Sequence, residues 1–343
     1  MPNNLMRLSD CTAGDKASSM ETQRLRSFLG MTAVISSDAM RTVMSFVEKI
    51  ARSNAAVLIT GESGSGKELI ARALHSYSTR CGKPWIDINC AALPDHLLES
   101  ELFGYEKGAF SGAESAKPGM FELANHGTLF LDEIAELNPK SQGKMLRVLD
   151  GWPHYRLGGT RKVEVDVRIV AATNADLAAE VKAGRFRADL YHRLNQISVT
   201  APPLRERPED VGPLARLFLA QETEGLGISD QAVAALQCYS WPGNIRELKN
   251  LAVRLAALTN CIEIHWDDLP QEFRDAQQQR QDPPNFSLDD LEQEVIFNAL
   301  AQTEGRRDRA AEMLGISQRT LIRRLKEYGV RPTRPNACGR AVM

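Results

Sequence analysis

A run of glycine, serine and lysine stands between an apolar stretch and a helical pattern near residue 60. Residues 61–68 read Gly-Glu-Ser-Gly-Ser-Gly-Lys-Glu, which matches the pattern G-x-x-x-x-G-K. Glycines let such a backbone curve so that its N–H groups point at phosphate oxygens, and the lysine adds a positive charge. A strand over 57–60 and a helix over 68–75 aim the positive end of the helix dipole at the anion, which disfavours an ordinary surface loop. The run therefore predicts a site for the phosphates of a nucleotide, made of Gly61, Glu62, Ser63, Gly64, Ser65, Gly66, Lys67 and Glu68.

Glu68 stands where this pattern usually has a Ser or Thr that binds the metal ion. A carboxylate within about 4 Å of a phosphate costs several kcal/mol at an effective dielectric constant near 20. We therefore expect Glu68 either to turn away from the phosphates or to lie against the metal ion.

Two acids, Asp132 and Glu133, come directly after a predicted apolar strand at residues 128–131, about 65 residues after Lys67. The carboxyl edge of a parallel sheet is where α/β proteins bind ligands. In nucleotide hydrolysis the first acid holds Mg²⁺ and the second polarises the attacking water. Solvated acids ahead of a helix are the alternative, and the phosphate loop upstream makes it the weaker one.

Four further polar residues have weaker signals. Asn174 ends another apolar run, so it could hydrogen-bond the attacking water or the γ-phosphate, although Asn also forms turns. Arg187 and Arg193 have helical spacing, and Arg246 follows Trp-Pro-Gly-Asn-Ile on a predicted helix. An arginine at a phosphoryl-transfer site stabilises transition-state charge, but the sequence alone does not show that these arginines reach one.

Strand-like and helical runs alternate from about residue 29 to 203, which predicts an α/β fold with a mostly parallel sheet covered by helices on both faces. Residues 204–272 have only helical periodicity, as in 211–222, 229–239 and 244–260, and predict a small helical subdomain. The predicted strands are 57–60, 85–88, 128–131, 167–172 and 196–200. The predicted divisions are a short N-terminal arm (1–28), the α/β core (29–203), the helical subdomain (204–272), a Gln/Pro-rich linker (273–287), a C-terminal helical domain (288–331) and a tail (332–343).

The C-terminal end is basic, although the 343-residue chain has a net charge of −2. Residues 306–334 contain nine Arg or Lys against three Asp or Glu, which suggests a nucleic-acid module on an acidic body. An apolar skeleton with Gly315 at a turn predicts a helix-turn-helix, with Ser317 capping the second helix. The skeleton consists of Ala310, Ala311, Leu314, Ile316, Leu321 and Leu325. A helical hairpin with a solvated basic face is the alternative. The second helix has residue types suited to base edges and phosphates of double-stranded DNA, namely Gln318, Arg319, Thr320, Arg323 and Arg324.

The six cysteines are scattered and include no C-x-x-C pair, which argues against zinc ribbons and fits a reducing compartment. The chain has no apolar run of membrane-spanning length, and its first residues do not resemble a signal peptide. These features predict a cytoplasmic protein.

Seven longer motifs follow one another along the chain, namely GESGSGKE (61–68), NCAAL (89–93), ELFGYEKGAFSGA (101–113), GTLFLDEI (127–134), FRADLYHRLN (186–195), PPLRER (202–207) and WPGNIRELKN (241–250). They occur in the order seen in bacterial enhancer-binding proteins, the AAA+ ATPases that activate sigma-54 RNA polymerase, and the chain resembles this family over roughly 29–330. The resemblance implies that residues 61–68 bind ATP. The C-terminal segment RAAEMLGISQRTLIRRLKEYG is similar to the Fis-type DNA-binding domain of the family.

The resemblance implies a role for each matching residue. Asp132 would hold Mg²⁺, Glu133 would activate water, and Asn89 would pair with Glu133 as a γ-phosphate switch. Asn174 and Arg246 would be the two sensors, and Glu68 is what the family normally has at its position. Arg187 and Arg193 would enter a neighbouring subunit's site, so the active form should be a homo-oligomeric ring, expected to be a hexamer. The mobile loop that contacts sigma-54 holoenzyme would be Gly108, Ala109, Phe110, Ser111, Gly112 and Ala113, with Phe110 as the apolar contact.

Two features depart from the family pattern. Most members have Thr where this chain has Ser111, which keeps the hydroxyl and loses a methyl group. In addition, about 28 N-terminal residues are too few for a receiver or ligand-sensing domain. We therefore expect any control to come from a separate regulatory protein or from expression level, an arrangement similar to that of the phage-shock activator.

Three functions compete at this point. The resemblance favours an ATP-driven activator that binds upstream DNA and converts the closed sigma-54 promoter complex to the open one. A DNA-binding repressor that uses its ATPase core only for oligomerisation is disfavoured, because Lys67, Asp132 and Glu133 are all present. A DNA motor is disfavoured by the GAFSGA segment and the Fis-like end.

Overall fold

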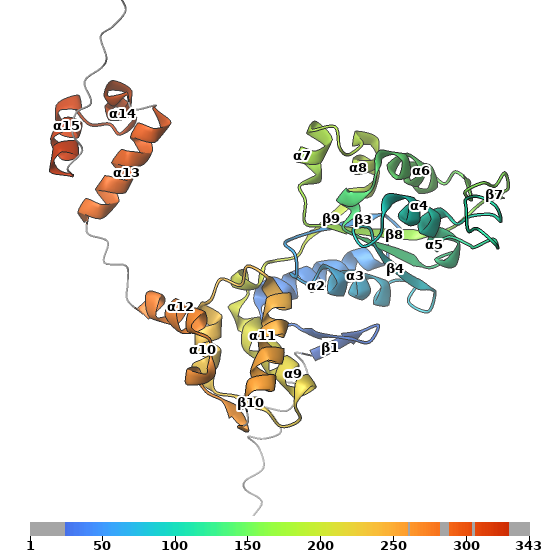
Figure 1. The fold of residues 1–343 in the computed structure, drawn as a ribbon, viewed down its shortest axis with the longest axis horizontal. Coiled ribbons are helices and arrows are strands. Elements are labelled where there is room, and N and C mark those ends of the chain that lie inside the picture. Colours follow the sequence, from blue (N-terminus) through green and yellow to red (C-terminus); the bar gives the residue numbers. More distant parts are fainter. Residues whose placement is uncertain (1–24, 260, 282–287, 304–305, 329–343) are drawn as a thin grey trace, which may run out of the picture. The chain divides into compact units, whose positions relative to one another are not determined.

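The computed structural model describes residues 25–259, 261–281, 288–303 and 306–328. These residues form two compact units, which divide between Gln277 and Gln278 (Figure 1). None of the described helices is long and apolar enough to cross a membrane.

A five-stranded parallel sheet forms the centre of the first unit, with the strand order β4-β5-β8-β3-β9. All five predicted strands are confirmed to within one residue at each end. Their bounds are β3 Val57–Thr60, β4 Trp85–Asn89, β5 Thr128–Asp132, β8 Arg168–Thr173 and β9 Ile197–Thr200.

Helices cover both faces of this sheet, as predicted, because successive strand residues point to opposite sides. Val57 and Ile59 pack against α2 (Asp38–Ala51) and α3 (Lys67–Ser76), whereas Leu58 faces the other layer. That layer contains α4 Asp95–Phe103, α5 Met120–Leu123, α6 Pro139–Leu149, α7 Leu177–Lys182 and α8 Ala188–Leu194. The three central strands β5, β8 and β3 are therefore apolar on both faces, and their polar residues lie at the strand ends.

Two small hairpins extend the α/β core. The first joins β1 (Leu25–Phe28) to β2 (Met31–Val34), and Phe28 is buried in the core. The last four residues of the predicted N-terminal arm are therefore part of the core, and residues 1–24 lie outside the described residues. The second hairpin joins β6 (His154–Tyr155) to β7 (Lys162–Val163).

The helical subdomain begins after β9 and contains η2 (Leu204–Glu206) and η3 (Pro208–Asp210) before its first long helix. Its core surrounds the fully buried Trp241. The helix α12 (Gln271–Gln281) occupies most of the predicted linker. Phe273 of this helix packs into the core of the subdomain, so the subdomain continues past its predicted end at residue 272. The helices are α9 Val211–Glu222, α10 Asp230–Cys238, α11 Asn244–Leu258 and α12 Gln271–Gln281, with η4 at Trp266–Asp268 and a short β10–β11 pair at Gly227–Ile228 and Glu263–Ile264.

The second unit contains α13 (Leu288–Gln302), α14 (Arg307–Met313) and α15 (Gln318–Glu327). Its core includes Ala310, Ala311, Leu321 and Leu325, all of them in the predicted skeleton. Gly315 has a φ of 65° at the turn between α14 and α15, a conformation that glycine adopts without strain. The helix-turn-helix is thus confirmed, while the predicted tail at 332–343 lies outside the described residues.

Candidate nucleotide and sigma-54 site

The phosphate-loop motif lies between β3 and α3, as the sequence predicts. Gly61, Gly64 and Gly66 all have positive φ values, of 151°, 74° and 98°. The Lys67 side chain is buried, and its Nζ donates to the carbonyl oxygens of Gly61 at 3.0 Å and Glu62 at 3.3 Å. The lysine is therefore held inside the curve of the loop, at the N-terminus of α3, where an anion is favoured.

The two acids lie beside this lysine. Asp132 is the last residue of β5, and Glu133 has a left-handed φ of 52° that turns the chain as the strand ends. Glu133 Oε1 lies 3.7 Å from Lys67 Nζ. Burial, with a contribution from Glu133, raises the pKa of Asp132, and Lys67 opposes the shift. One cation and two carboxylates thus meet at the carboxyl edge of the sheet.

Asn89 bonds to Asp132 in this structure. Strands β4 and β5 are in register at Asn89 and Asp132, and the Asn89 side-chain amide donates to Asp132 Oδ2 at 3.1 Å. Glu133 Oε2 instead accepts from the backbone N–H of Asn174, at 3.2 Å, from the end of β8. Asn89 thus bonds to the first acid, which strand register places opposite it, and its pairing with Glu133 as a γ-phosphate switch stays a prediction.

Glu68 turns away from the loop. Its Oε1 accepts from Arg72 Nε at 2.9 Å and lies 2.7 Å from Arg72 Nη2, one helical turn further along α3. Of the two alternatives for Glu68, this pairing fits the first, in which the carboxylate turns away from the phosphates. Among the described residues, no group of three or more His, Cys, Asp or Glu could hold a metal ion. Asp132 fits a Mg²⁺ ion that takes its other ligands from phosphates and water.

Residues of the helical subdomain contact the loop directly. Arg246 Nη1 donates to Ser63 Oγ at 2.7 Å, so this predicted sensor lies at the nucleotide loop. Arg205 binds both carboxylate oxygens of Glu62, at 2.6 and 2.9 Å, and these bonds together with the Asn244 amide lower the pKa of Glu62 to about 2. A side chain at residue 64 would meet the Gly243 carbonyl at 2.6 Å, so the close approach of the subdomain requires Gly64.

Sequence reasoning missed three residues of this contact, namely Arg205, Asn244 and Arg207, whose Nη2 donates to the Ser65 carbonyl. They lie within PPLRER and WPGNIRELKN, two motifs that supported the family resemblance but were assigned only one site residue, Arg246. The position of Asn244 just after a Pro-Gly turn was the available signal, because Asn tolerates a left-handed backbone, and its φ is 52°.

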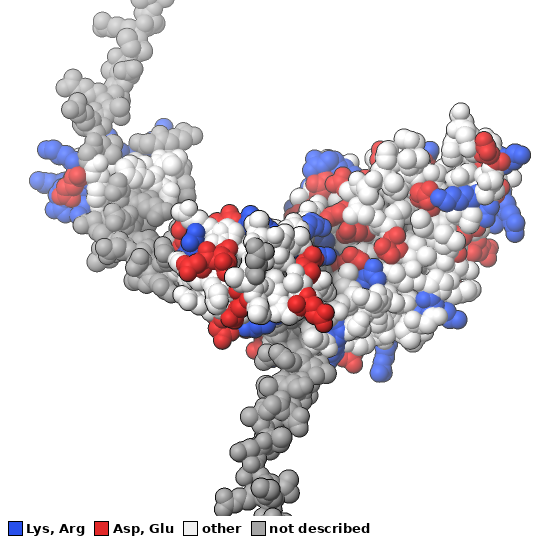
Figure 2. Space-filling model, turned by 60° about the horizontal axis from the view of Figure 1, so that its bottom comes forward, with Lys and Arg blue, Asp and Glu red and all other residues white. Residues whose placement is uncertain are grey.

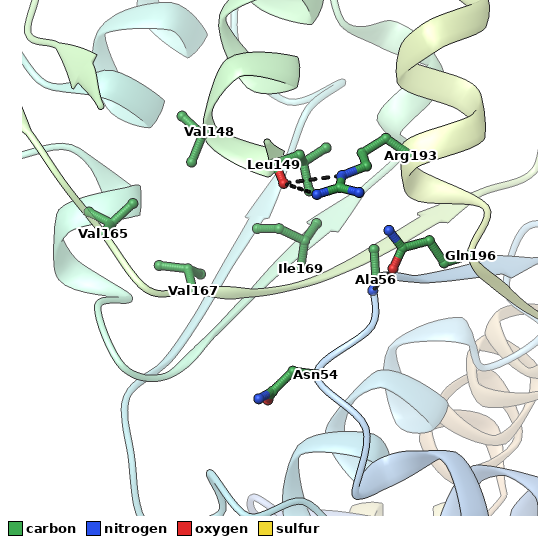
Figure 3. Close-up of a pocket in the computed structure, with 9 residues that line it drawn as sticks. All are labelled: Asn54, Ala56, Val148, Leu149, Val165, Val167, Ile169, Arg193 and Gln196. Atoms are coloured by element: carbon green, nitrogen blue, oxygen red, sulfur yellow. Dashed lines mark hydrogen bonds between the residues drawn. The ribbon is translucent and has the colours of Figure 1, made fainter. Parts of the chain in front are cut away.

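The two remaining arginines lie away from this loop. Arg187 forms a two-point ion pair with Asp189, at 2.7 and 3.0 Å. Arg193 donates to the Leu149 carbonyl through Nε and Nη2, at 3.2 and 2.9 Å, and so caps the last turn of α6 (Figure 3). It borders a pocket that includes Ala56 and Gln196, which precede β3 and β9. Arg193 therefore lies at the amino ends of the strands, opposite the nucleotide loop.

The GAFSGA segment forms a turn closed by a hydrogen bond from the Gly108 N–H to the Ala113 carbonyl, at 2.9 Å. Phe110 is 44% exposed, and its ring lies 4.9 Å from that of Tyr105. Gly108 and Gly112 have positive φ, and Ser111 is exposed. The loop thus presents an aromatic side chain and a hydroxyl to solvent.

In the second unit, basic side chains gather on one side (Figure 2). Gln318, Arg319 and Arg323 are exposed on α15, and Thr320 is partly exposed near the Ser317 cap, whose Oγ accepts from Thr320 N at 3.1 Å. Arg324 differs from this set, because its Nε lies 2.8 Å from Glu292 of α13 and its Nη1 3.3 Å from Glu327. The Glu292 carboxylate raises the pKa of Arg324. Arg324 therefore links α15 to α13 through an ion pair, in addition to its predicted contact with DNA.

Comparison with known protein families matches three successive segments of the chain. Residues 33–200 match the Sigma-54 interaction domain, 205–285 the AAA+ ATPase lid domain and 287–328 the Fis family of bacterial regulatory proteins. These boundaries follow the α/β core, the helical subdomain and the helix-turn-helix unit.

Curated relatives align over most of the chain. It is 47% identical to the regulatory protein AtoC of Escherichia coli, covering 86% of this chain and 67% of AtoC. It is 42% identical to the DNA-binding transcriptional regulator NtrC of Proteus hauseri, covering 85% of this chain and 68% of NtrC. Crystal structures of NtrX from Brucella abortus in complex with ADP and with ATP superpose with a TM-score of 0.65 at 34% identity, covering 92% of this chain and 72% of NtrX. On this evidence the chain belongs to the sigma-54-dependent transcriptional regulators, with an AAA+ ATPase domain, its lid and a Fis-type DNA-binding domain.

Proposed function

We propose that this protein binds upstream DNA and uses ATP hydrolysis to convert the sigma-54 RNA polymerase promoter complex from closed to open. The observation that carries the proposal is the meeting of Lys67, Asp132 and Glu133 at one sheet edge, in a chain that also exposes a GAFSGA loop. A regulator that used this core only for oligomerisation would have no need of a buried lysine facing two carboxylates.

The roles of the loop residues follow from their positions. Lys67 binds the outer phosphates, and the N–H groups at the start of α3 bind the anion. Asp132 would hold Mg²⁺, which supplies charge neutralisation between the phosphates when bound. Glu133, oriented by the backbone N–H of Asn174, accepts a proton from the attacking water. The side chain of Asn174, at the same edge, would hydrogen-bond that water or the γ-phosphate.

The position of Arg193 supports a ring. The strand β3 has four residues, and at about 3.3 Å per residue its amino and carboxyl ends are roughly 13 Å apart. Arg193 is at the amino edge and the chain's own phosphate loop is at the carboxyl edge, so Arg193 serves a neighbouring subunit. Arg187 is exposed at the start of the same helix and has the same role. In a hexameric ring, each nucleotide site would receive Arg187 and Arg193 from the neighbouring subunit.

Phe110 is the proposed contact with sigma-54, because it is an exposed aromatic at the tip of a two-glycine turn. Sigma-54 is incubated with the protein and ADP–aluminium fluoride, a transition-state analogue, and the complex is captured. We expect wild type to retain sigma-54 and Phe110→Ala to lose it while keeping its ATPase activity. Phe46→Ala is the matched control, because Phe46 is a 41% exposed aromatic on α2.

Two results would contradict the proposal. The absence of ATP hydrolysis by wild type at high protein concentration would support the repressor with an inert core. Hydrolysis without any capture of sigma-54 would support a DNA motor.

A further inference from the structure

Three consecutive carbonyl groups of the phosphate loop accept hydrogen bonds from the lid and the segment that leads into it. The Ser63 carbonyl accepts from the Asn244 side-chain amide at 3.1 Å, and the Gly64 carbonyl from the Ile245 N–H at 3.0 Å. The Ser65 carbonyl accepts from Nη2 of the buried Arg207. The lid therefore contacts the backbone of the loop, in addition to its side chains.

These contacts determine which way the loop's N–H groups point. In a planar trans peptide the C=O and N–H bonds point in opposite directions. A Ser63 carbonyl directed at Asn244 thus turns the Gly64 N–H away from the lid, and a Ser65 carbonyl directed at Arg207 does the same for the Gly66 N–H. The Gly64–Ser65 peptide between them differs, because its N–H already has a partner inside the loop. The Ser65 N–H donates to the Glu62 carbonyl at 3.2 Å.

Asn244 is built into this position. It is fully buried with a left-handed φ of 52°, and its Oδ1 accepts from the Leu204 N–H at 2.7 Å. Its Nδ2 donates to Ser63 O and to Glu62 Oε2, at 3.1 and 3.0 Å. Since both of those partners can only accept, the orientation of the amide is determined.

Arg207 adds a charge to the same arrangement. Its side chain is 2% exposed, and Asp210 Oδ2 lies 3.9 Å from its Nη1. Asp210 in turn accepts from Ser36 N, Ser37 N and Ser37 Oγ, each at 2.8 Å, at the start of α2. A hydrogen bond from a guanidinium polarises the Ser65–Gly66 peptide and strengthens its N–H as a donor.

We propose that Asn244 and Arg207 are positioning residues for ATP, which act by orienting the Ser63–Gly64 and Ser65–Gly66 peptides so that their N–H groups face the phosphates. The proposal rests on the proposed ATP site. Lid position and phosphate affinity are then coupled, because a lid that swings away releases both carbonyls.

The first test replaces Asn244 by aspartate. Asn244→Asp keeps the shape, the tolerance of a left-handed backbone and the acceptor for Leu204 N–H, but removes the donor and places a carboxylate beside Glu62 and the Ser63 carbonyl. Binding of fluorescent N-methylanthraniloyl-ADP at pH 8 should weaken by about 10-fold or more, as expected for one lost buried hydrogen bond with added repulsion. The KM for ATP should rise with it, while kcat changes by less than about threefold.

Arg207→Lys is the second variant. It keeps a cation but replaces the planar fork by a single ammonium group, and it should weaken N-methylanthraniloyl-ADP binding by about 3- to 10-fold. Arg216→Gln is the matched control, because Arg216 lies on the lid helix α9 and bonds to Asp230 of the same lid, outside the phosphate-loop contact. It should bind within about twofold of wild type.

The outcomes are distinguishable. If wild type binds the fluorescent ADP and a folded Asn244→Asp or Arg207→Lys binds it equally well, the positioning role is wrong. An equal loss in Asn244→Asp and Arg216→Gln would also overturn it, because it would show that any change in the lid weakens binding. If wild type itself binds no nucleotide, the proposed function fails instead.

Discussion

Glu68 Oε1 lies 2.7 Å from Arg72 Nη2, so the carboxylate at the end of the phosphate loop pairs along its own helix. The Arg72 guanidinium also lies 5.7 Å from the Trp85 ring centroid and donates to the Leu29 carbonyl. Glu68 thereby neutralises an arginine that packs α3 against β4 and the β1–β2 hairpin, and it leaves the metal site to Asp132.

Replacing Glu68 by glutamine should have little effect on nucleotide binding. Glu68→Gln removes the charge but keeps the size of the side chain, and an i,i+4 pair contributes about 0.2–0.5 kcal/mol. Calorimetry should give an ADP affinity close to that of wild type and a small drop in unfolding temperature. A large loss of Mg²⁺-dependent affinity would show that Glu68 acts at the metal after all.

Lys67→Ala and Glu133→Ala should both abolish turnover, for different reasons. Without Lys67 the outer phosphates lose their cation, so nucleotide binding itself should fail. Without Glu133 the water loses its base, so hydrolysis should fall by at least about 100-fold while ADP still binds. Steady-state phosphate release and equilibrium binding separate the two effects, and a Glu133→Ala variant with near-normal hydrolysis would exclude Glu133 as the base.

Mixed rings should show that Arg193 acts between subunits. Arg193→Ala should lower hydrolysis by about 10³-fold, the lower end for a lost transition-state arginine. Lys67→Ala subunits are inactive but still carry Arg193, so mixing the two inactive variants should restore part of the activity. No recovery in mixtures that sedimentation shows to be co-assembled would contradict action in trans.

The Glu62–Arg205 pair should make stability depend on acidity. The folded pKa of Glu62 is about 2, below its ordinary value of 4.5. The stabilisation is therefore complete above about pH 4.5 and is lost as the pH falls toward 2. Because both side chains are more than 40% exposed, its size should be below about 1 kcal/mol. In urea titrations at several pH values, Arg205→Gln should make the free energy of unfolding depend less on pH below about 4.5. An unchanged pH dependence in this range would show that the pair contributes nothing.

Two arginines of α15 should differ in their effect on DNA binding. Arg323→Ala should weaken binding to double-stranded DNA and reduce the salt slope by about one, with little change in unfolding. Arg324→Ala should in addition lower the unfolding temperature, because it removes the ion pairs to Glu292 and Glu327. Salt-dependent fluorescence anisotropy and thermal melts distinguish them, and identical melts would contradict the packing role of Arg324.

Much of the architecture was predictable from the sequence, because short-range patterns specify it. Short apolar runs specified the five strands, and helical periodicity with Ser317 as a cap specified the helix-turn-helix. The spacing of Gly61, Gly66 and Lys67 determined the phosphate loop, since only glycines allow that curvature next to a helix start. These features depend on neighbours within a few residues, so they can be read from the chain itself.

The choice of partners was decided only by the tertiary structure. Asn89 bonds to Asp132 and not to Glu133, because the register of two strands 43 residues apart selects the first acid. The contact of Asn244 with Ser63 joins positions 181 residues apart, and no local pattern encodes which carbonyl a buried amide meets. Sequence determined which chemical groups the site contains, whereas packing between distant segments determined which of them touch, because a hydrogen bond depends on distances that only the folded chain sets.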